Sequence, residues 1–253
     1  MTWEPDRYLQ YADERLRPAV DLLARVPLRQ PRHIVDLGCG AGNVTRLLAE
    51  RWPEAQITGL DSSSAMLERA RGELPGVLFE QTGVEHWEAD EPLDLLFSNA
   101  ALHWVEDHAS LFPRLVEALF PGGVLAVQMP GNFEAPSHRL IREVAALPDF
   151  AEATARVRMG AVLAMADYHH LLAPLSTRLS LWETTYWQSF TGTAPVLDWL
   201  RGSTLVPYLS AMDEAMRTRF LAELEVRLRA AYPPDAQGTT LFPFRRIFIL
   251  AQR

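Results

Sequence analysis

Lysine is absent from this 253-residue chain, in which all 24 basic residues are arginine. The absence excludes Schiff-base chemistry and a phosphate-binding P-loop, because both depend on a lysine amine. It leaves the recognition of carboxylates to arginine, whose planar guanidinium suits that task better. The net charge of −8 argues against a nucleic-acid partner, because neutralising phosphates requires clustered positive charge.

Cysteine and long apolar runs are also scarce. The single cysteine, Cys39, cannot form an intrachain disulfide, so nothing favours an oxidising compartment. The first residues, MTWEPDRYLQYADER, are polar and acidic, unlike a secretory signal peptide, and no apolar run approaches the roughly 18 residues that cross a bilayer. We therefore expect a cytoplasmic protein that does not enter a membrane. His169 and His170 lack a third ligand at useful spacing, so no metal site is expected.

Strands and helices are predicted to alternate through the first half of the chain. The expected strands are short apolar runs at 34–37, 56–61, 76–83, 93–100 and 122–129. Apolar side chains recur at helical spacing in the segments between or before them: 18–26, 44–52, a serine-capped helix through 66–70, and 109–119. This alternation predicts an α/β protein with a parallel, doubly wound sheet.

The second half of the chain shows a different pattern of expected helices and strands. Residues 137–175 are expected to be helical and loopy, 210–232 to form a helix, and 179–190 and 245–253 to form strands that join the same sheet. The helical segments then form a cap inserted around those strands. We predict a single domain over 1–253, with a helical lid at 1–30, a cofactor-binding core at 31–130, and the cap with the last two strands, on the acceptor side, at 131–253.

The glycine-rich segment DLGCGAGN follows the first strand and indicates a nucleotide site. Gly38 permits a tight turn, Gly40 lets a ligand approach the backbone, and Gly42 lets the next helix pack closely. Asp36 precedes them where it would repel a pyrophosphate but suit a positively charged ligand, which disfavours a nicotinamide-dependent oxidoreductase. Asp61 ends the second strand, where an acid can accept both ribose hydroxyls. The sequence therefore predicts S-adenosylmethionine, which carries an ammonium, a sulfonium and no phosphate.

Three segments, VDLGCGAGN, GLDSSSAML and FSNAALHW, resemble the motifs of class I methyltransferases. The resemblance implies a Rossmann-like sheet of seven strands with the last one antiparallel. It implies Asp36 near the methionine amine, Asp61 on the ribose, and Met66 near the adenine, with core packing as the alternative for Met66. TGVE stands where many members carry an acid, so Gly83 and Val84 would act through backbone or packing. The implied cofactor-binding residues are Asp36, Gly38, Cys39, Gly40, Asp61, Ser62, Met66, Gly83, Val84, Asn99 and Ala100.

Longer segments resemble the trans-aconitate 2-methyltransferase family, which esterifies a carboxylate of a small tricarboxylic acid. The resemblance covers nearly the whole chain and rests on RYLQYADERLRPAVDLLARVPL, GGVLAVQMPGNFEAPSH, WETTY and RRIFILA. Two positions depart from the family pattern. Gly131 stands before Asn132 where members carry aspartate, and Val206 stands where they carry an arginine. Loss of that arginine would remove an anion clamp and leaves a less charged acid open as the acceptor.

The expected reaction is an in-line methyl transfer from S-adenosylmethionine to a carboxylate. It needs no general base, because a carboxyl group with a pKa near 4 is already ionised. A phenol, amine, carbon or carrier-bound acceptor would need one, and His103, after the fourth strand, is the candidate catalytic residue; a structural histidine is the alternative. A protein that binds the cofactor without transferring methyl also stays open.

The acceptor pocket is expected at the carboxyl ends of the central strands, beneath the lid. Tyr8, Tyr11 and Arg15 share a helix face that either closes over the substrate or packs on the core. Arg246 contacts either the substrate or an internal carboxylate. The partner is expected to be a small organic acid, and the protein a monomer or homodimer. The predicted substrate-binding residues are Trp3, Tyr8, Tyr11, Arg15, Trp104, Gln128, Asn132 and Arg246.

Overall fold

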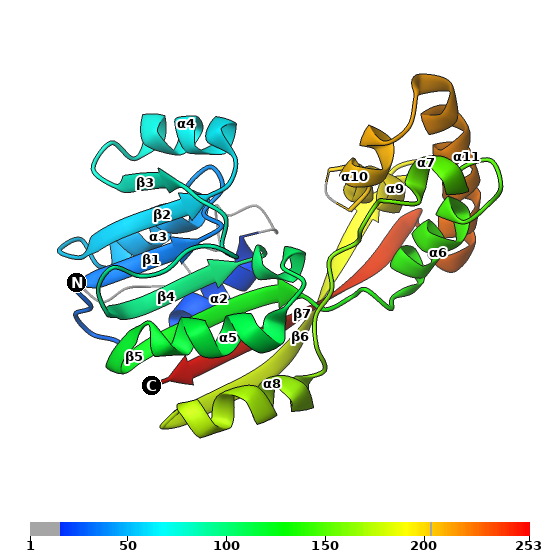
Figure 1. The fold of residues 1–253 in the computed structure, drawn as a ribbon. Helices are drawn as coiled ribbons and strands as arrows, with labels where there is room; N and C mark the ends of the chain where they lie inside the picture. Colours follow the sequence, from blue (N-terminus) through cyan, green and yellow to red (C-terminus); the bar gives the residue numbers. More distant parts are fainter. Residues whose placement is uncertain (1–15, 203) are drawn as a thin grey trace. The chain divides into compact units, whose positions relative to one another are not determined.

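The computed structural model describes residues 16–253 except residue 203, and its centre is a seven-stranded mixed sheet (Figure 1). The strand order is β3-β2-β1-β4-β5-β7-β6. β1 pairs in parallel with β2 and β4, β2 with β3, and β4 with β5, whereas β7 runs antiparallel to β5. The strands are β1 (His33–Leu37), β2 (Gln56–Asp61), β3 (Leu78–Gln81), β4 (Leu93–Asn99), β5 (Leu119–Pro130), β6 (Arg178–Thr191) and β7 (Thr239–Gln252).

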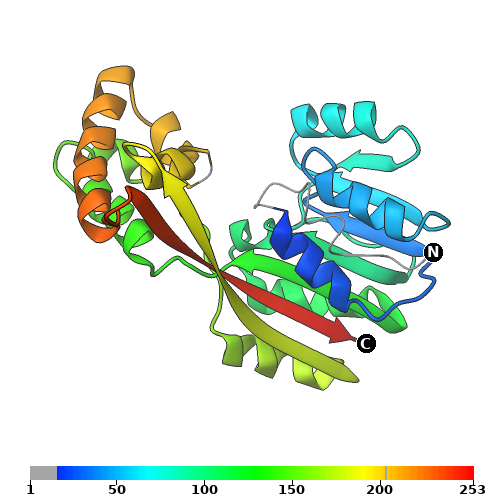
Figure 2. The same cartoon turned by 180° about the vertical axis from the view of Figure 1, so that it is seen from behind.

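Helices cover both faces of the parallel strands. Comparison of Figures 1 and 2 shows α2 (Arg17–Arg25) and α3 (Asn43–Arg51) on one face, and α5 (His108–Glu117) and α8 (Met165–Leu172) on the other. Among the described residues, the sheet is also flanked by α4 (Ser64–Glu73) and two 3₁₀ turns, η1 (Leu102–Trp104) and η2 (Ala173–Leu175). The predicted doubly wound α/β fold with an antiparallel last strand is thus confirmed.

Local sequence explains where these helices begin and end. Ser63 caps α4, its hydroxyl accepting from the backbone N–H of Met66 at 3.4 Å. Asp107 caps α5 in the same way through the N–H of Ser110 at 3.0 Å. α3 ends shortly before Pro53, which cannot continue a helix. The predicted serine cap is therefore confirmed, and each strand is followed by a sharply defined connection.

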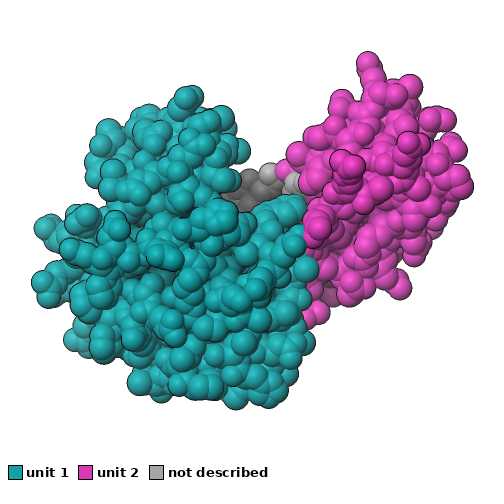
Figure 3. All heavy atoms as spheres, viewed as in Figure 1, with its two compact units in different colours: residues 1–130, 161–183, 246–253 teal, residues 131–160, 184–245 magenta. Residues whose placement is uncertain are grey.

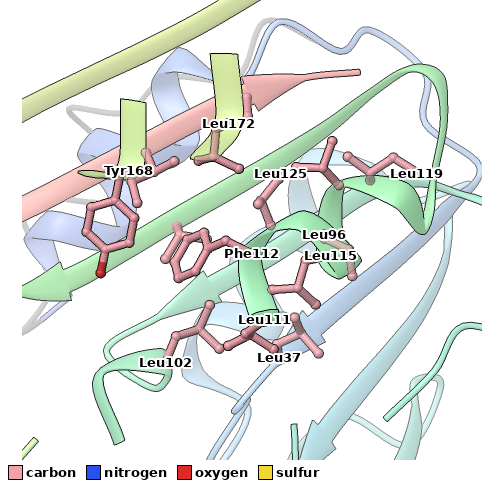
Figure 4. Close-up of a cluster of buried hydrophobic side chains, with 14 of the residues drawn as sticks. Leu37, Leu96, Leu102, Leu111, Phe112, Leu115, Leu119, Leu125, Tyr168 and Leu172 are labelled. Carbon is pink, nitrogen blue, oxygen red and sulfur yellow. The ribbon is translucent and has the colours of Figure 1, made fainter. Parts of the chain in front are cut away.

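The main apolar core lies between the sheet and the face covered by α5 and α8. Figure 4 shows Leu37, Leu96 and Leu125 from three neighbouring strands pointing toward Phe112 of α5 and Leu172 of α8. All of these side chains are 0% exposed. Burying a leucine or phenylalanine side chain contributes about 1.5–3 kcal/mol. This core holds β1, β4 and β5 in register, so that their carboxyl ends meet at one edge.

The chain forms two compact units (Figure 3). Unit 1 comprises the residues up to 130 together with 161–183 and 246–253, and unit 2 comprises 131–160 and 184–245. Unit 2 has its own apolar core, which includes Phe220 and Phe242. Unit 2 contains the parts of β6 and β7 that fall within 184–245. Among the described residues it also contains five helices: α6 (Pro136–Ala145), α7 (Ala151–Thr154), α9 (Pro195–Arg201), α10 (Val206–Ser210) and α11 (Glu214–Ala231). The single domain with lid, core and cap stays a prediction.

Three details of the second half differ from the sequence prediction. The long helix begins at Glu214 and not at 210, because Asp213 caps it through the N–H of Met216 at 2.7 Å. The last strand begins at Thr239, six residues before the predicted 245. The short helix α9, which has Pro195 as its first residue, was not predicted. Propensity and periodicity over so few residues give too weak a signal to find it.

Candidate active site

The glycine turn between β1 and α3 takes a backbone shape that ordinary residues resist. Gly38, Gly40 and Gly42 have φ values of 72°, 55° and 84°, all in the left-handed region. A Cβ on Gly38 would lie 2.2 Å from the Cβ of Ala101, whereas one on Gly40 would meet no described residue within 4 Å. Gly38 therefore serves close packing against the segment after β4, and Gly40 leaves its outer side open to a ligand.

Gly42 packs the start of α3 against α4. A Cβ there would lie 3.2 Å from a methyl carbon of Leu74 and 3.3 Å from the Cβ of Ala70. The predicted role of Gly42 was close helix–strand packing; the structure shows the close neighbour to be another helix.

The carboxylate of Asp61 is fixed beside the glycine turn by two backbone amides. Gly40 N–H donates to its Oδ2 at 2.9 Å and Ser63 N–H donates to its Oδ1 at 2.8 Å. Each oxygen keeps lone pairs for further donors, and the side chain is only partly buried. A pair of adjacent hydroxyls, such as those of a ribose, fits this acceptor. The geometry agrees with the predicted role of Asp61.

Asp36 lies under the turn and is 1% exposed. Burial raises the pKa of its carboxyl group from 3.8 to about 7, and repulsion from Asp61 adds to the rise. Thr45 of α3 opposes it by donating its hydroxyl to Asp36 Oδ2 at 2.6 Å. A nearby cation would favour the ionised form, so this carboxyl group suits a positively charged ligand. Sequence reasoning missed Thr45, whose only signal is a hydroxyl on the helix face toward β1.

The ends of β4 and β5 bring two amide side chains to this edge of the sheet. Asn99 and Gln128 are register partners on the two strands, and Ala100 N–H donates to the carbonyl of Gln128 at 2.9 Å. Ala100 has a φ of 56°, the one positive value among the described non-glycine residues. Such conformations store strain and concentrate at functional sites.

The amide of Gln128 is 1% exposed, yet neither its oxygen nor its nitrogen has a hydrogen-bond partner among residues 16–253 outside position 203. The Oδ1 of Asn99 is also buried and lacks a partner within that described part of the chain. An unpaired buried polar group costs about 1–3 kcal/mol, so proteins seldom keep one without a use. These groups therefore fit polar ligand atoms at the carboxyl ends of the strands.

η1 carries the predicted catalytic residue. His103 is 6% exposed, and its ring lies 4.8 Å from that of Trp104, which is 51% exposed. The carbonyl of His103 accepts from Ala161 N–H at 2.9 Å. The structure thus places His103 and Trp104 directly after the strand that ends in Asn99, in unit 1 with the glycine turn.

For the other predicted cofactor residues, the structure gives burial and contacts that point less directly to a role. Cys39 is buried, and burial raises the pKa of its thiol. Met66 is 43% exposed on α4, which excludes the core-packing alternative for it. The carbonyl of Val84 accepts from the guanidinium of Arg114 at 3.1 Å, which fixes the segment after β3 that also holds Gly83. Ser62 directly follows Asp61 and is exposed.

The predicted substrate-binding residues do not all belong to the same unit, and four of them lie outside the described residues. Arg246 is 7% exposed and lies in unit 1, in register with Pro130 at the end of β5. Asn132 belongs to unit 2, is 4% exposed, and lies with its amide nitrogen 3.3 Å from a ring nitrogen of His138. Val206, one of the two departures, is half exposed at the start of α10. Trp3, Tyr8, Tyr11 and Arg15 lie outside the described residues.

The described residues form neither a membrane-spanning helix nor a metal-binding cluster. No helix within the described part of the chain is long and apolar enough to cross a membrane. Residues 16–253 apart from 203 also hold no group of three or more histidine, cysteine, aspartate or glutamate side chains arranged to bind a metal ion.

Comparisons with known proteins agree with this site. Residues 34–123, from β1 into β5, match a family described as a methyltransferase domain. A trans-aconitate 2-methyltransferase of Methylobacterium nodulans is 49% identical, over 99% of this chain and 98% of its own length. One of Streptomyces coelicolor is also 49% identical, over 100% of this chain and 87% of its own length.

Solved structures share the fold at much lower identity. The YcgJ protein of Bacillus subtilis superposes with a TM-score of 0.61 at 15% identity, covering 93% of this chain and 97% of its own. A methyltransferase of Mesorhizobium loti, described as dependent on S-adenosylmethionine, superposes with a TM-score of 0.56 at 22% identity and covers 97% of this chain.

Proposed function

The chain belongs to the trans-aconitate 2-methyltransferase family, and from that premise we propose that it transfers the methyl group of S-adenosylmethionine to a carboxylate of trans-aconitate. The observation that carries the proposal is 49% identity to curated members along nearly the whole of both chains. The site supports it, because its polar groups suit a ligand with a diol and a positive charge.

On this proposal the residues of unit 1 hold the cofactor. Asp61 accepts the ribose hydroxyls, Gly40 offers its open side, and Asp36 supplies negative charge near the methionine amine. When bound, S-adenosylmethionine supplies an electrophilic methyl group on a sulfonium. The protein aligns the two reacting atoms at about 3–3.5 Å and keeps water out. The sulfonium loses its positive charge as the methyl group is transferred. Negative carboxylates therefore have to bind the cofactor without stabilising its cation so strongly that transfer is slowed.

We propose that the acceptor is held by Gln128, Trp104 and Arg246, together with the predicted lid. The buried guanidinium of Arg246 suits one carboxylate, and the amide nitrogen of Gln128 suits another. Carboxylate acceptors are ionised at neutral pH, so the reaction requires no proton removal by His103, and the structural alternative for His103 is the one that fits this acceptor. The resemblance implies an arginine where this chain has Val206, so on this proposal carboxylate recognition falls to the groups just named.

The test is turnover with purified protein, S-adenosylmethionine and trans-aconitate, measured as release of S-adenosylhomocysteine. Cis-aconitate, citrate and isocitrate are assayed in parallel. We expect efficient turnover of trans-aconitate alone. Turnover of none of the four acids, with S-adenosylmethionine still raising the melting temperature, would refute the substrate and keep the cofactor.

A pair of matched variants tests the cofactor site. Asp61→Asn weakens acceptance of the ribose hydroxyls, so we expect weaker binding of S-adenosylhomocysteine by calorimetry. Asp94→Asn is the control, because Asp94 also accepts from two backbone amides, those of Arg32 and His33, at 2.8 and 2.9 Å. These contacts are at the opposite, amino-terminal end of β1. Equal losses of affinity in the two variants would contradict the assigned site.

We further propose that the protein acts in the cytoplasm on a small-molecule acid, without nucleic acid, as a monomer or homodimer. The net charge of −8 and the scarcity of cysteine support this proposal. Light scattering coupled to gel filtration measures the mass, and a mass above that of two chains would contradict it.

A further inference from the structure

A buried chain of hydrogen bonds connects α8, α5 and the turn η1 within unit 1. Leu163 N–H donates to the hydroxyl of Tyr168 at 3.2 Å. That hydroxyl lies 2.6 Å from His108 Nδ1, and His108 Nε2 lies 2.8 Å from the carbonyl oxygen of Leu102. We call these four residues the His108–Tyr168 bridge.

The chemistry of the end groups fixes the direction of every bond in the bridge. The carbonyl of Leu102 can only accept, so His108 must carry its hydrogen on Nε2. Nδ1 then accepts from the hydroxyl of Tyr168, which in turn accepts from Leu163 N–H. Burial lowers the pKa of His108 and raises that of Tyr168, so both side chains stay neutral. The bridge therefore has one arrangement of hydrogens.

Packing makes the bridge rigid. His108 is 3% exposed, and Tyr168 and Phe112 are 0% exposed. The ring of Phe112 lies 5.2 Å from that of His108 and 4.9 Å from that of Tyr168. Figure 4 shows Tyr168 next to Phe112, with Leu102 on the neighbouring turn. Neither His108 nor Tyr168 can change rotamer without disturbing this core.

The bridge holds the turn that carries His103 and Trp104. Its last acceptor is Leu102 O, and Ala161 N–H donates to the next carbonyl, that of His103, at 2.9 Å. The residue before Leu102 is Ala101, whose Cβ occupies the space beside Gly38. Two consecutive carbonyls of η1, those of Leu102 and His103, are thus held by hydrogen bonds from α5 and from the 161–168 segment. Ala101, just before them, lies against the glycine turn.

We propose that His108 and Tyr168 are positioning residues for methyl transfer, which hold η1 at the distance from the glycine turn that the reaction requires. The inference rests on the proposed function for what the turn serves. The bridge touches neither cofactor nor acceptor, and it acts through Leu102 and Ala101. A misplacement of about 1 Å between reacting groups can cost two orders of magnitude in rate, which makes such support worthwhile.

Two substitutions of His108 separate positioning from simple core packing. A glutamine amide reaches about as far as Nε2, so His108→Gln keeps the donor to Leu102 O. An asparagine amide reaches only about as far as Nδ1, so His108→Asn loses that donor. Both variants lose the ring, and both are expected to lower the melting temperature to a similar extent.

We expect His108→Asn to lower kcat for trans-aconitate by about tenfold or more with little change in KM for S-adenosylmethionine, and His108→Gln to retain kcat within about threefold. Tyr168→Phe keeps the donor to Leu102 and provides a further variant should His108→Asn not fold. Its kcat is expected to fall less than the tenfold expected for His108→Asn. All assays are run well below the melting temperatures. Equal kcat in the asparagine and glutamine variants would overturn the proposal.

Hydrogen exchange gives a readout that does not depend on activity. The N–H groups of Trp104 and Val105 bond within the turn, to Ala101 O and Leu102 O. We expect a peptide spanning 99–106 to exchange faster in His108→Asn than in His108→Gln. Unchanged exchange in both would overturn the positioning role. A wild-type enzyme that does not turn over trans-aconitate would refute the proposed function, while the exchange result would still decide whether the bridge holds the turn.

Discussion

Alanine substitutions in the glycine turn should separate stability from cofactor binding. Gly38→Ala forces a side chain into left-handed backbone at φ 72° and places its Cβ 2.2 Å from that of Ala101. The backbone strain costs about 1–2 kcal/mol and the overpacking about 1–3 kcal/mol, for a total of about 2–5 kcal/mol. For a chain of this length that lowers the melting temperature by about 4–20 °C.

Gly40→Ala should behave differently, because none of the residues that the structure describes lies within 4 Å of the new Cβ. Only the backbone strain remains, about 1–2 kcal/mol. The new methyl group instead occupies the side proposed for the cofactor, so we expect the Kd for S-adenosylhomocysteine to rise at least about tenfold, which is about 1.4 kcal/mol. Gly122→Ala is the matched control, because Gly122 also has a positive φ, 88°, and open space around its Cβ, but lies in β5 away from the turn.

The assays are thermal or urea unfolding for stability and calorimetry for the Kd. The double variant Gly38→Ala/Ala101→Gly should recover the overpacking part of the loss, because it removes the clashing Cβ. If Gly40→Ala and Gly122→Ala bind S-adenosylhomocysteine equally well, the glycine turn is not the cofactor site. If the double variant is no more stable than Gly38→Ala, the contact with Ala101 is not the cause of the loss.

Four further predictions concern single side chains. The pKa of Asp36 is raised to about 7 in the folded protein, so its contribution to stability is full below about pH 4 and is lost as the pH rises through 7, by roughly 4 kcal/mol in total. Urea denaturation without cofactor should therefore show a flatter pH dependence for Asp36→Asn, and an unchanged slope would contradict the assignment. Gln128→Leu removes two buried atoms that have no hydrogen-bond partner in the described part of the chain, so stability should hold or rise by about 1–3 kcal/mol while turnover is lost. A variant that is less stable but fully active would count against a ligand role. His103→Asn should retain turnover of trans-aconitate, with a kcat that stays constant between about pH 6 and pH 9. If kcat of the wild type falls at acidic pH and this fall is lost in the variant, His103 is a base. Val206→Arg introduces the arginine that the family resemblance implies at this position and should lower KM for trans-aconitate; an unchanged KM would show that this position takes no part in recognising the acid.

The sequence was sufficient for the features that rest on local pattern. The alternation of apolar runs predicted the sheet, and the glycines predicted the tight turn after β1, whereas the roles of Asp36 and Asp61 toward a ligand stay predictions. These features are encoded within a few residues of each other or repeat at a regular period. The serine cap of α4 followed for the same reason.

Features that depend on distant segments were not predictable in this way. Thr45 bonds Asp36 because a helix face turns back on β1, and Ala101 meets Gly38 across 63 residues of chain. The bond between His108 and Tyr168 spans 60 residues. No local pattern marks either partner as special, since an isolated histidine or tyrosine on a helix is most simply a packing residue. The division into two units likewise follows from contacts between segments far apart in the sequence.

The place of β7 in the sheet has a consequence for how the chain folds during synthesis. β7 lies between β5 and β6, yet it follows both of them in the sequence and is synthesised after them. Until they emerge, β5 presents an unpaired apolar edge, including the positions of Val127 and Met129 that later pair with Ile249 and Ile247. Exposed strand edges of this kind favour association with other chains. β6 is made more than forty residues earlier and must wait for its neighbour. The nascent protein thus depends on β7 to close the sheet, and chains released before β7 is synthesised would be prone to aggregate.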